Sequence, residues 1–471
     1  MSTPASDAPA PAAGPCHVGI VGGGLLGMTL ALRLRAQGHR VTLVEAAPAP
    51  GGLASAAEIG GYTWDRFYHV ILLSDLHTRG LLGELGLEDR LRWGQTRTGF
   101  YSDGRLHSLS SSLEYLTFPL LNPLDKARLA ATILHAARVT RPEPLEAIPV
   151  VEWLTRWSGR RVVERLWLPL LRAKLGENWR HASAAFIWAI IARMYAARRS
   201  GLKREMMGYV DGGYALVLER LEAALRARGV ALRCGCPVAE VRPRAGGGAE
   251  VVLRDGERLA VDQAVLTVPA GRAATLLPGL TAAERRRLEG VTYQGIVCAS
   301  ALLARPLGGY YVTNITDAWV PFTGVIEMTA LVDRARFGGH TLVYLPRYLT
   351  QDDAFWRQDD AAVEAEFTAA LLRMYPHLTR ADIRAFRVAR VREVLAVPTL
   401  HYSRDALPPT ATSLESIHLV NSAQIVNGTL NVNETVALAD AKARELAPRL
   451  RAHPDTPRPA APAPPAPLVE A

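Results

Sequence analysis

Three glycines near the start of the chain have the spacing needed to hold a phosphate group against the backbone. Gly22, Gly24 and Gly27 stand between an apolar run at residues 17–21 and a helix-like stretch at residues 28–35. In such a strand–turn–helix unit the first glycine permits the tight turn, the second lets the backbone approach a diphosphate, and the third lets the helix pack on the strand. The free N–H groups and the positive dipole end of the helix then face the phosphate charges. The spacing therefore predicts a Rossmann-type dinucleotide-binding turn.

An acidic residue at a suitable distance supports this interpretation. Glu45 ends a second apolar run, at residues 41–44, and stands 18 positions after Gly27. A carboxylate at this point accepts hydrogen bonds from the ribose hydroxyls of the adenosine. It would repel a 2′-phosphate, so the sequence disfavours NADP.

A glycine pair after the acid favours FAD over NAD. Gly51 and Gly52 begin six residues beyond Glu45 and are followed by Leu53. This arrangement resembles the extended fingerprint of the FAD-dependent amine-oxidase superfamily, which includes protoporphyrinogen oxidases, phytoene desaturases and UDP-galactopyranose mutases. The resemblance implies FAD as the cofactor, with the backbone of the glycine pair close to the pyrophosphate and the ribityl chain. Many members have Arg or Lys after the glycines, where this chain has Leu53.

The middle of the chain resembles the second flavin-domain segment of the same superfamily. Gly212 and Gly213 open a helix-like repeat of leucines, and a strand-like run follows at residues 238–241. The resemblance implies that the backbone at Val238 meets the adenine of the cofactor.

The C-terminal part adds a third segment of resemblance. Residues 417–422 are typical of a buried strand that ends in polar side chains, and a helix is predicted at residues 431–449. The superfamily places the N-terminus of this helix at the flavin, where the helix dipole stabilises negative charge on the reduced ring. The resemblance makes Asn421 and Glu434 candidate cofactor-binding residues. Asn421 stands where glycine is common in the superfamily.

A histidine is the candidate for a catalytic side chain. Residues 60–69 resemble the stretch beside the flavin ring in the superfamily, with Phe67 in place of a glycine. The resemblance implies that Tyr68 and His69 face the substrate side. The alternative is that His69 is a core histidine whose hydrogen bonds are met by the backbone.

The resembling segments define a discontinuous flavin domain. We expect an α/β fold, with a glutathione-reductase-like, Rossmann-type FAD-binding domain and an inserted α+β substrate domain. The first insert is predicted to be mostly helical, with amphipathic runs at residues 151–159 and 184–199, and the second to mix strands with a helix at residues 360–375. Active sites in this architecture lie between the two domains. The predicted ranges are 1–15 for a disordered tail, 16–75, 208–290 and 390–450 for the FAD-binding domain, 76–207 and 291–389 for the substrate domain, and 451–471 for a disordered Pro/Ala-rich tail.

The charge of the chain is concentrated in one segment. The 471 residues are 49% apolar and 21% charged, with a net charge of +9. Residues 151–204 hold twelve basic residues against three acidic ones, together with five tryptophans. The segment is either a helical lobe with a basic surface and a tryptophan core, or a contact for an anionic membrane surface or a phosphate-bearing substrate. The arginines form no continuous run and no nucleic-acid-binding motif accompanies them, so we expect no nucleic-acid partner.

The cysteines and the terminal segments indicate the cellular compartment in which we expect the protein. The four cysteines show neither a disulfide framework nor zinc-ligand spacing, so no metal site is predicted. Residues 1–15 lack the basic start and apolar centre of a secretory peptide. The apolar run at residues 182–192 is too short to cross a bilayer. We expect a cytoplasmic protein, with membrane association at the periphery as the alternative.

The sequence carries no hydrolase or kinase motif that would supply its own chemistry. There is no G-x-S-x-G elbow, no H-E-x-x-H pair and no P-loop. This is typical of a flavoenzyme, in which FAD carries the redox chemistry and the protein positions the substrate. The resemblance favours an oxidoreductase that removes two electrons from a C–N or C–C bond of a small molecule, hydrophobic or phosphate-bearing. The alternatives are a nucleotide-sugar mutase without net redox, whose substrate pyrophosphate the basic insert would suit, and a non-catalytic flavin-binding protein.

Overall fold

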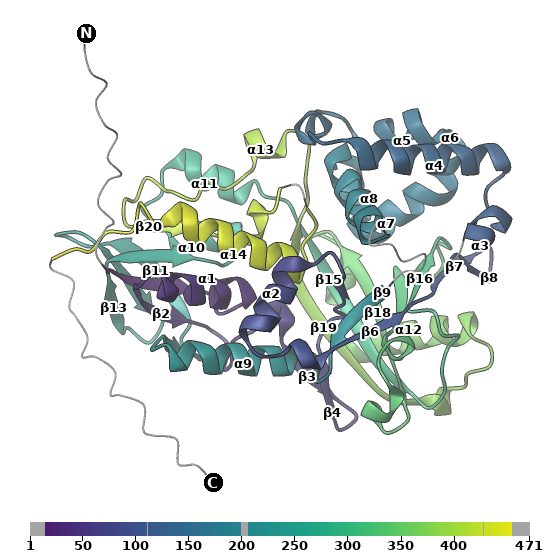
Figure 1. The fold of residues 1–471 in the computed structure, drawn as a ribbon, viewed down its shortest axis with the longest axis horizontal. Coiled ribbons are helices and arrows are strands. Elements are labelled where there is room, and N and C mark those ends of the chain that lie inside the picture. Colours follow the sequence, from purple (N-terminus) through teal and green to yellow (C-terminus); the bar gives the residue numbers. More distant parts are fainter. Residues whose placement is uncertain (1–14, 111, 199–205, 427, 455–471) are drawn as a thin grey trace.

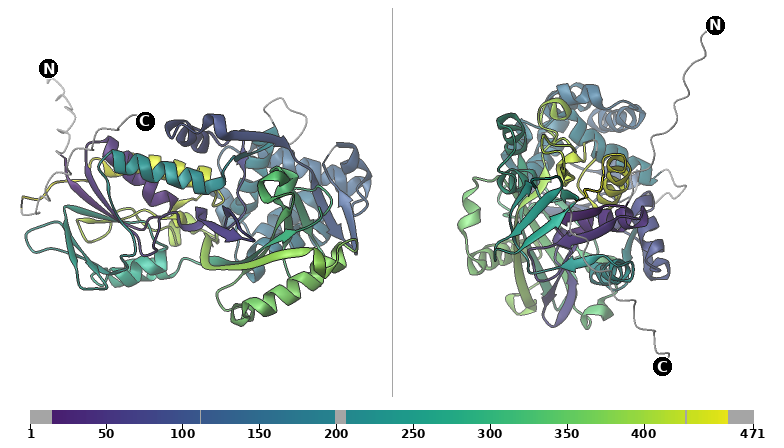
Figure 2. Two further views of the ribbon diagram at one scale, coloured as in Figure 1. Left: turned by 90° about the horizontal axis from the view of Figure 1, so that it is seen from below. Right: turned by 90° about the vertical axis from the view of Figure 1, so that its left-hand side faces the viewer.

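A five-stranded parallel sheet forms the centre of one end of the elongated molecule (Figures 1 and 2). The computed structural model describes residues 15–110, 112–198, 206–426 and 428–454. Every neighbouring pair of strands in this sheet is parallel, and all five residues of β1 are buried, as expected for a sheet covered on both faces. In order across the sheet the strands are β10 (Ala231–Arg233), β2 (Arg40–Val44), β1 (His17–Val21), β14 (Gln263–Leu266) and β20 (Ile417–Leu419).

The two faces of this sheet are covered by different structures. Side chains of β1 point to both faces of the sheet. Val18 and Ile20 pack in the core on the helical side, and Val21 packs in the core on the opposite side. The helical layer consists of α1 (Leu25–Ala36), α2 (Leu76–Glu84), α9 (Gly213–Ala227) and α14 (Val432–Leu446). The opposite layer consists of β11 (Val238–Pro243), β12 (Ala249–Leu253), β13 (Arg258–Val261), α10 (Ala270–Leu276) and α11 (Ala282–Glu289). The predicted Rossmann-type fold is confirmed.

A mixed seven-stranded sheet forms the other end of the molecule. One of its faces packs on α12 (Asp360–Met374), the helix predicted at residues 360–375, and the other packs on Trp64 and Phe67. In order the strands are β19 (Ile383–Ala396), β15 (Tyr293–Leu303), β18 (Thr341–Leu349), β17 (Gly324–Glu327), β16 (Val312–Ile315), β7 (Thr98–Ser102) and β8 (Arg105–Ser108).

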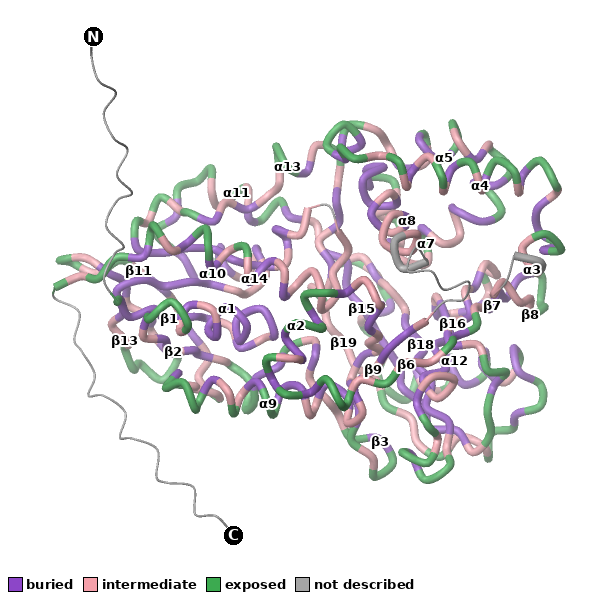
Figure 3. Tube along the Cα trace, in the orientation of Figure 1, coloured by how far each residue is buried: buried purple, intermediate pink, exposed green. Residues whose placement is uncertain are grey.

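A helical lobe stands beside this second sheet. Trp153 and Trp167 are buried in its core, which matches the interpretation of a lobe with a tryptophan core. In Figure 3 the tube along α4 and α5 alternates between buried, intermediate and exposed residues. The lobe consists of α3 (Ser112–Thr117), α4 (Pro123–Arg138), α5 (Val150–Ser158), α6 (Arg160–Val162), α7 (Leu168–Leu175) and α8 (Ala184–Arg198).

Short strands connect the two ends of the molecule, and they show that the first insert is not helical throughout. Its residues 91–108 form β6, β7 and β8; β6 pairs with β9, and β7 pairs with β16 and with β8. Strand β19 spans residue 390, where the FAD-binding domain was predicted to resume. The connecting elements are β3 (Ala56–Ile59), β4 (Tyr62–Asp65), β5 (Ile71–Leu72), β6 (Leu91–Gln95), β9 (Met206–Val210) and α13 (Tyr402–Asp405). We retain the domain ranges as a proposal; most of the two predicted tails lies outside the described residues.

Within the described part of the chain, no helix combines the length and the apolar character that a membrane span requires.

Candidate functional site

Four parallel strands end in a row of residues along one edge of the sheet. Glu45 follows β2, Gly22 follows β1, Thr267 follows β14, and Asn421 lies just beyond β20. Because these strands are adjacent and parallel, the four residues lie along the same edge in that order. Ligands of open α/β sheets bind outside this carboxyl edge.

The glycine turn after β1 leaves no room for side chains. Gly22 has φ +113°, and a Cβ built on it would lie 2.5 Å from Oγ1 of Thr267. A Cβ on Gly27 would lie 2.0 Å from the carbonyl oxygen of Gly22. Thr267 also donates a hydrogen bond of 2.9 Å to that oxygen. The turn therefore has the close helix-to-strand packing that the spacing predicted, and Thr267 adds a contact that the sequence did not reveal.

The second glycine pair lies directly against this turn. The backbone N–H of Gly51 donates to the carbonyl oxygen of Gly23 at 2.8 Å, and Gly24 forms an isolated bridge with Gly51. A Cβ on Gly52 would lie 3.0 Å from Cα of Gly24. Gly24 is also the N-cap of α1. Two segments of bare backbone thus meet at a helix N-terminus, which is a cradle suited to a diphosphate.

Glu45 is held by the same turn. One of its carboxylate oxygens accepts a hydrogen bond of 2.6 Å from the N–H of Gly23, and the other accepts one of 2.7 Å from Ala47. A carboxylate oxygen accepts more than one hydrogen bond, so the Glu45 carboxylate can still accept hydrogen bonds from ribose hydroxyls. Glu45 is therefore oriented before any ligand binds.

A pocket of about 200 Å³ opens beside Glu45 at this edge. Val238 lies in its wall, where the resemblance placed the adenine contact. Arg254 and Arg272 also reach it, and neither was singled out from the sequence. The pocket is lined by Val21, Gly22, Val44, Glu45, Ala46, Cys236, Pro237, Val238, Arg254, Val268, Arg272 and Leu276. Its place beside the diphosphate cradle fits the adenosine end of FAD.

The N-terminus of α14 lies beside that of α1. The two helices are neighbours, and Arg33 of α1 binds Asp440 of α14 at 2.6 Å. Asn431 caps α14 by accepting the N–H of Glu434 at 3.0 Å. Because both helices follow strands of one parallel sheet, both positive dipole ends face the carboxyl edge. Glu434 thus lies in the first turn of α14, as predicted; its role with the cofactor is a proposal.

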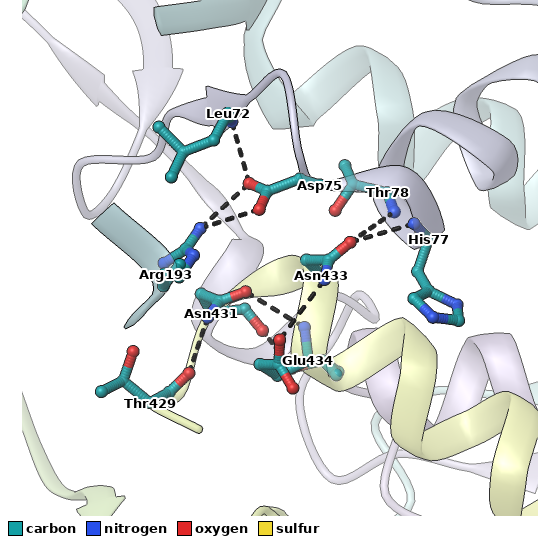
Figure 4. A network of polar contacts seen from close by, with 10 residues as sticks. Leu72, Asp75, His77, Thr78, Arg193, Thr429, Asn431, Asn433 and Glu434 are labelled. Atoms are coloured by element: carbon teal, nitrogen blue, oxygen red, sulfur yellow. Dashed lines mark hydrogen bonds and ion pairs between the residues drawn. The ribbon is translucent and has the colours of Figure 1, made fainter. Parts of the chain in front are cut away.

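A polar network fixes α14 to its surroundings (Figure 4). The side-chain oxygen of Asn433 accepts the N–H groups of His77 and Thr78 at 3.0 and 3.3 Å, which attaches the first turn of α2. Next to it, Arg193 of α8 donates to both carboxylate oxygens of the buried Asp75. The network joins the helical lobe to the sheet end of the molecule at the helix N-terminus.

Asn421 is fully buried at the end of β20. Its side-chain oxygen accepts a hydrogen bond of 3.1 Å from the backbone N–H of Ala423, and its backbone N–H donates to the side-chain oxygen of Gln424. Among the described residues its Nδ2 has no hydrogen-bond partner. A buried donor of this kind costs free energy unless a ligand satisfies it, which supports the proposal that Asn421 contacts the cofactor.

His69 is held between an acid and a tyrosine. Its Nδ1 lies 3.5 Å from Oδ2 of the buried Asp65, and its ring centroid lies 4.7 Å from that of Tyr214. Asp65 also accepts the N–H of Tyr214 at 2.7 Å. Burial and then Asp65 raise the pKa of the Tyr214 hydroxyl. Nδ1 has no hydrogen-bond partner within the described chain, so no described backbone group satisfies this nitrogen.

One helix connects His69 with the glycine cradle. Tyr214 and Leu218 lie one turn apart on α9; Tyr214 contacts His69, and Leu218 is the side chain that a Cβ on Gly51 would meet, at 2.6 Å. On the other side, Arg66 donates to the carbonyl oxygen of Gly52 at 3.2 Å. Burial and then Arg387 lower the pKa of Arg66 from its ordinary value. Arg66 thus brings a cation to the segment in which Leu53 supplies none.

Comparison with known proteins places these features in a family. The model of the family described as flavin containing amine oxidoreductase matches residues 27–429. Coproporphyrinogen III oxidase of Mycobacterium tuberculosis (strain ATCC 25618 / H37Rv) is 29% identical over 320 residues, or 62% of this chain and 66% of that protein. The chain therefore spans just under two thirds of that relative's length.

A second relative and a solved structure agree with this result. Carotenoid phi-ring synthase of Streptomyces griseus is 27% identical over 423 residues, which cover 80% of this chain and 79% of that protein. The crystal structure of a putative protoporphyrinogen oxidase from Exiguobacterium sp. 255-15 superposes with a TM-score of 0.72 at 20% identity, over 92% of this chain and 98% of that one, which supports the fold. The chain belongs to the family of flavin-containing amine oxidoreductases.

Proposed function

We propose that this protein removes two electrons from a C–N or C–C bond of a hydrophobic organic molecule. The observation that carries the proposal is that the FAD cradle and the apolar face of the seven-stranded sheet meet at residues 64–69. Trp64 and Phe67 of this segment pack on the sheet, while Arg66 binds Gly52 of the cradle. When bound, FAD supplies the electron-accepting ring.

Each proposed cofactor contact has a distinct task. Gly22 permits the turn, Gly24 lets the backbone approach the diphosphate, and Gly27 lets the helix pack on the strand. Gly51 and Gly52 would extend this surface toward the ribityl chain. Glu45 would bind the adenosine ribose, Val238 the adenine, and Asn421 and the first turn of α14 at Glu434 the flavin end. Leu53 packs beside this path in the core of the sheet face.

His69 is the proposed catalytic side chain. Its Nδ1 lies 3.5 Å from Oδ2 of Asp65 and has no hydrogen-bond partner within the described chain. An imidazole beside a carboxylate is suited to accept or return the proton that accompanies oxidation of a C–H or N–H bond.

The substrate site is proposed between the sheet face and the helical lobe. The face is lined by aromatic and aliphatic side chains, including Tyr68, Ile296 and Tyr344. The relatives are named for a porphyrinogen and for a carotenoid, both of which are largely apolar bodies. An apolar site of this kind suits such a body.

The test is reduction of the flavin under anaerobic conditions. Purified holoprotein is mixed with coproporphyrinogen III, phytoene or putrescine, and the flavin absorbance is followed. Bleaching by one compound, restored by dioxygen, supports the proposal. Turnover of a nucleotide sugar that needs a pre-reduced flavin and consumes no reductant would support the mutase alternative instead. A flavin that none of these compounds alters would favour the non-catalytic alternative.

We also propose that the outer side of the helical lobe rests on an anionic membrane. Leu116, Leu124 and Leu134 are 65%, 59% and 43% exposed. Arg128 and Arg138 are exposed on the same helix, α4, as Leu124 and Leu134. Exposed leucines beside arginines match the apolar and charged layers of an anionic lipid surface.

Vesicle sedimentation tests this surface. The protein should bind phosphatidylglycerol vesicles more strongly than phosphatidylcholine vesicles, and the double variant Leu116→Ser, Leu124→Ser should bind both weakly. Equal binding of the variant and the wild-type protein would contradict the proposal.

A further inference from the structure

One face of the second sheet carries mostly apolar and aromatic side chains. Ile296 of β15 lies opposite Tyr348 of β18 in the sheet, and Cys298 continues the same face along β15. At the end of this face, Gln294 stands two residues before Ile296 on β15, and Tyr348 adds a hydroxyl group; we call this end the corner of the face. The corner lies next to Tyr68, since the hydroxyl oxygens of Tyr68 and Tyr348 are 2.9 Å apart.

A lysine of the helical lobe points at this corner. Nζ of Lys174, on α7, donates a hydrogen bond of 2.5 Å to the hydroxyl of Tyr348 and lies 3.9 Å from the centroid of its ring. No carboxylate pairs with Lys174 among the residues that the structure describes. An ammonium group has three N–H donors, so the side chain has two left.

A buried amide lies against the end of α7, the helix that carries Lys174. Gln294 is fully buried, and its Oε1 accepts a hydrogen bond of 2.8 Å from Asn178. Its Nε2 has no partner within the described chain and lies 3.4 Å from a Cβ built on Gly176, two residues beyond Lys174. A buried amide donor without a partner costs free energy, and a bound acceptor would remove that cost.

We infer that Lys174, Gln294 and Tyr348 form a subsite for a carboxylate of the substrate. This rests on the proposed function and adds the substrate class: an apolar body that carries an acidic group. A carboxylate offers two oxygens, one for the ammonium and one for the amide, and charge-assisted hydrogen bonds of this kind are the strong ones. A cationic amine would be repelled by Lys174, and a neutral polyene would leave both donors unsatisfied.

A matched pair of probes tests the subsite by binding alone. Coproporphyrin III has free carboxylates, and its tetramethyl ester has the same apolar body without them. Both are titrated into the FAD-loaded protein in the same buffer, and porphyrin fluorescence gives the dissociation constants. We expect the acid to bind about tenfold to a hundredfold more tightly than the ester, as charged hydrogen bonds would give.

Three variants identify the groups responsible. Lys174→Met should reduce the preference for the acid to less than about threefold, Gln294→Met should reduce it partly, and Lys174→Arg should restore most of it. Lys126→Met removes a lysine from the same lobe, where Nζ donates to Leu116, and should leave the preference unchanged. Flavin content should be the same in all of them.

The outcomes separate this inference from the proposed function. Equal affinity of the wild-type protein for acid and ester, or an undiminished preference in Lys174→Met, would overturn the subsite. Loss of FAD from Lys174→Met would show that the lysine serves the cofactor, and would overturn it as well. A preserved preference for the acid, with a flavin that coproporphyrinogen III does not reduce, would leave the subsite standing and count against porphyrinogen oxidation.

Discussion

The carboxylate of Glu45 and the backbone N–H of Gly23 form a hydrogen bond of 2.6 Å across the carboxyl ends of β1 and β2. A Cβ on Gly23 would lie 2.8 Å from Cβ of Glu45, so the glycine is needed for this approach. The acid and the turn are therefore one unit, in which the residue proposed to hold the ribose also orients the N–H groups proposed to hold the diphosphate.

Replacing Glu45 should weaken FAD retention without unfolding the chain. Glu45→Ala removes both backbone hydrogen bonds and the ribose contact, and we expect the dissociation constant for FAD to rise about tenfold to a hundredfold. Flavin fluorescence after dilution measures this. Glu58→Ala, at an exposed position on β3, is the control. Unchanged flavin content in Glu45→Ala would contradict the assigned role.

Gly27 should not tolerate a methyl group. In Gly27→Ala the new Cβ would meet the carbonyl oxygen of Gly22, so the helix must move off the strand. We expect FAD content to fall and the free energy of unfolding to drop by about 1–3 kcal/mol. Gly80→Ala, at an exposed position of α2 with open space around it, should instead be neutral or stabilising by up to about 1 kcal/mol. Similar thermal midpoints and flavin content for both variants would refute the close packing.

His69 should affect flavin reduction more than flavin binding. His69→Ala removes the imidazole beside Asp65, and we expect the rate of anaerobic flavin reduction to fall about a hundredfold, with FAD content unchanged. Stopped-flow absorbance measures the rate. His377→Ala, which lies exposed beside Pro306, serves as the control. A rate within about twofold of the wild type in His69→Ala would make the histidine structural.

The stability of the sheet should depend on pH through His418. This residue of β20 is 3% exposed, and burial, followed by Arg449, lowers its pKa from 6.5 to about 4. The folded chain keeps the imidazole neutral while the unfolded chain takes up a proton below pH 6.5. The stabilisation is therefore complete above pH 6.5 and is lost as the pH falls toward 4, by about 3 kcal/mol at most.

A variant isolates this contribution. His418→Gln cannot take up a proton, so its thermal midpoint should fall less between pH 7 and pH 4.5 than that of the wild-type protein. The thermal midpoint of the control variant His377→Gln should fall as much as that of the wild-type protein. If the thermal midpoint of His418→Gln fell as much as that of the wild-type protein, His418 would not control stability between pH 7 and pH 4.5.

The sequence predicted the parts of the site that depend on local spacing. The glycine turn, the acid after β2 and the helix at residues 431–449 are set by short-range geometry, and they lie at one edge of the sheet as expected. Thr267 is separated from Gly22 by 245 residues, so no spacing rule connects them. Arg254, Arg272 and Lys174 are ordinary basic residues until the fold turns them toward a pocket or a sheet face.

One contact, between Asp65 and His69, could have been predicted from the sequence. Asp65 and His69 stand four residues apart, a separation at which an acid and a histidine often meet, yet the segment between them is not helical. The strands of the first insert were missed for the opposite reason. Strands β6 and β7 pair with strands more than 100 residues away, which local patterns do not encode, whereas β7 and β8 form a local hairpin.

Flavin content tests the central claim most directly. Purified protein is denatured, and the released cofactor is identified by chromatography and quantified against the chain. The cradle at the edge of the parallel sheet predicts about one FAD per chain, and a yellow protein with the absorbance of a bound flavin. A colourless protein that takes up no FAD when supplied with an excess would contradict the account.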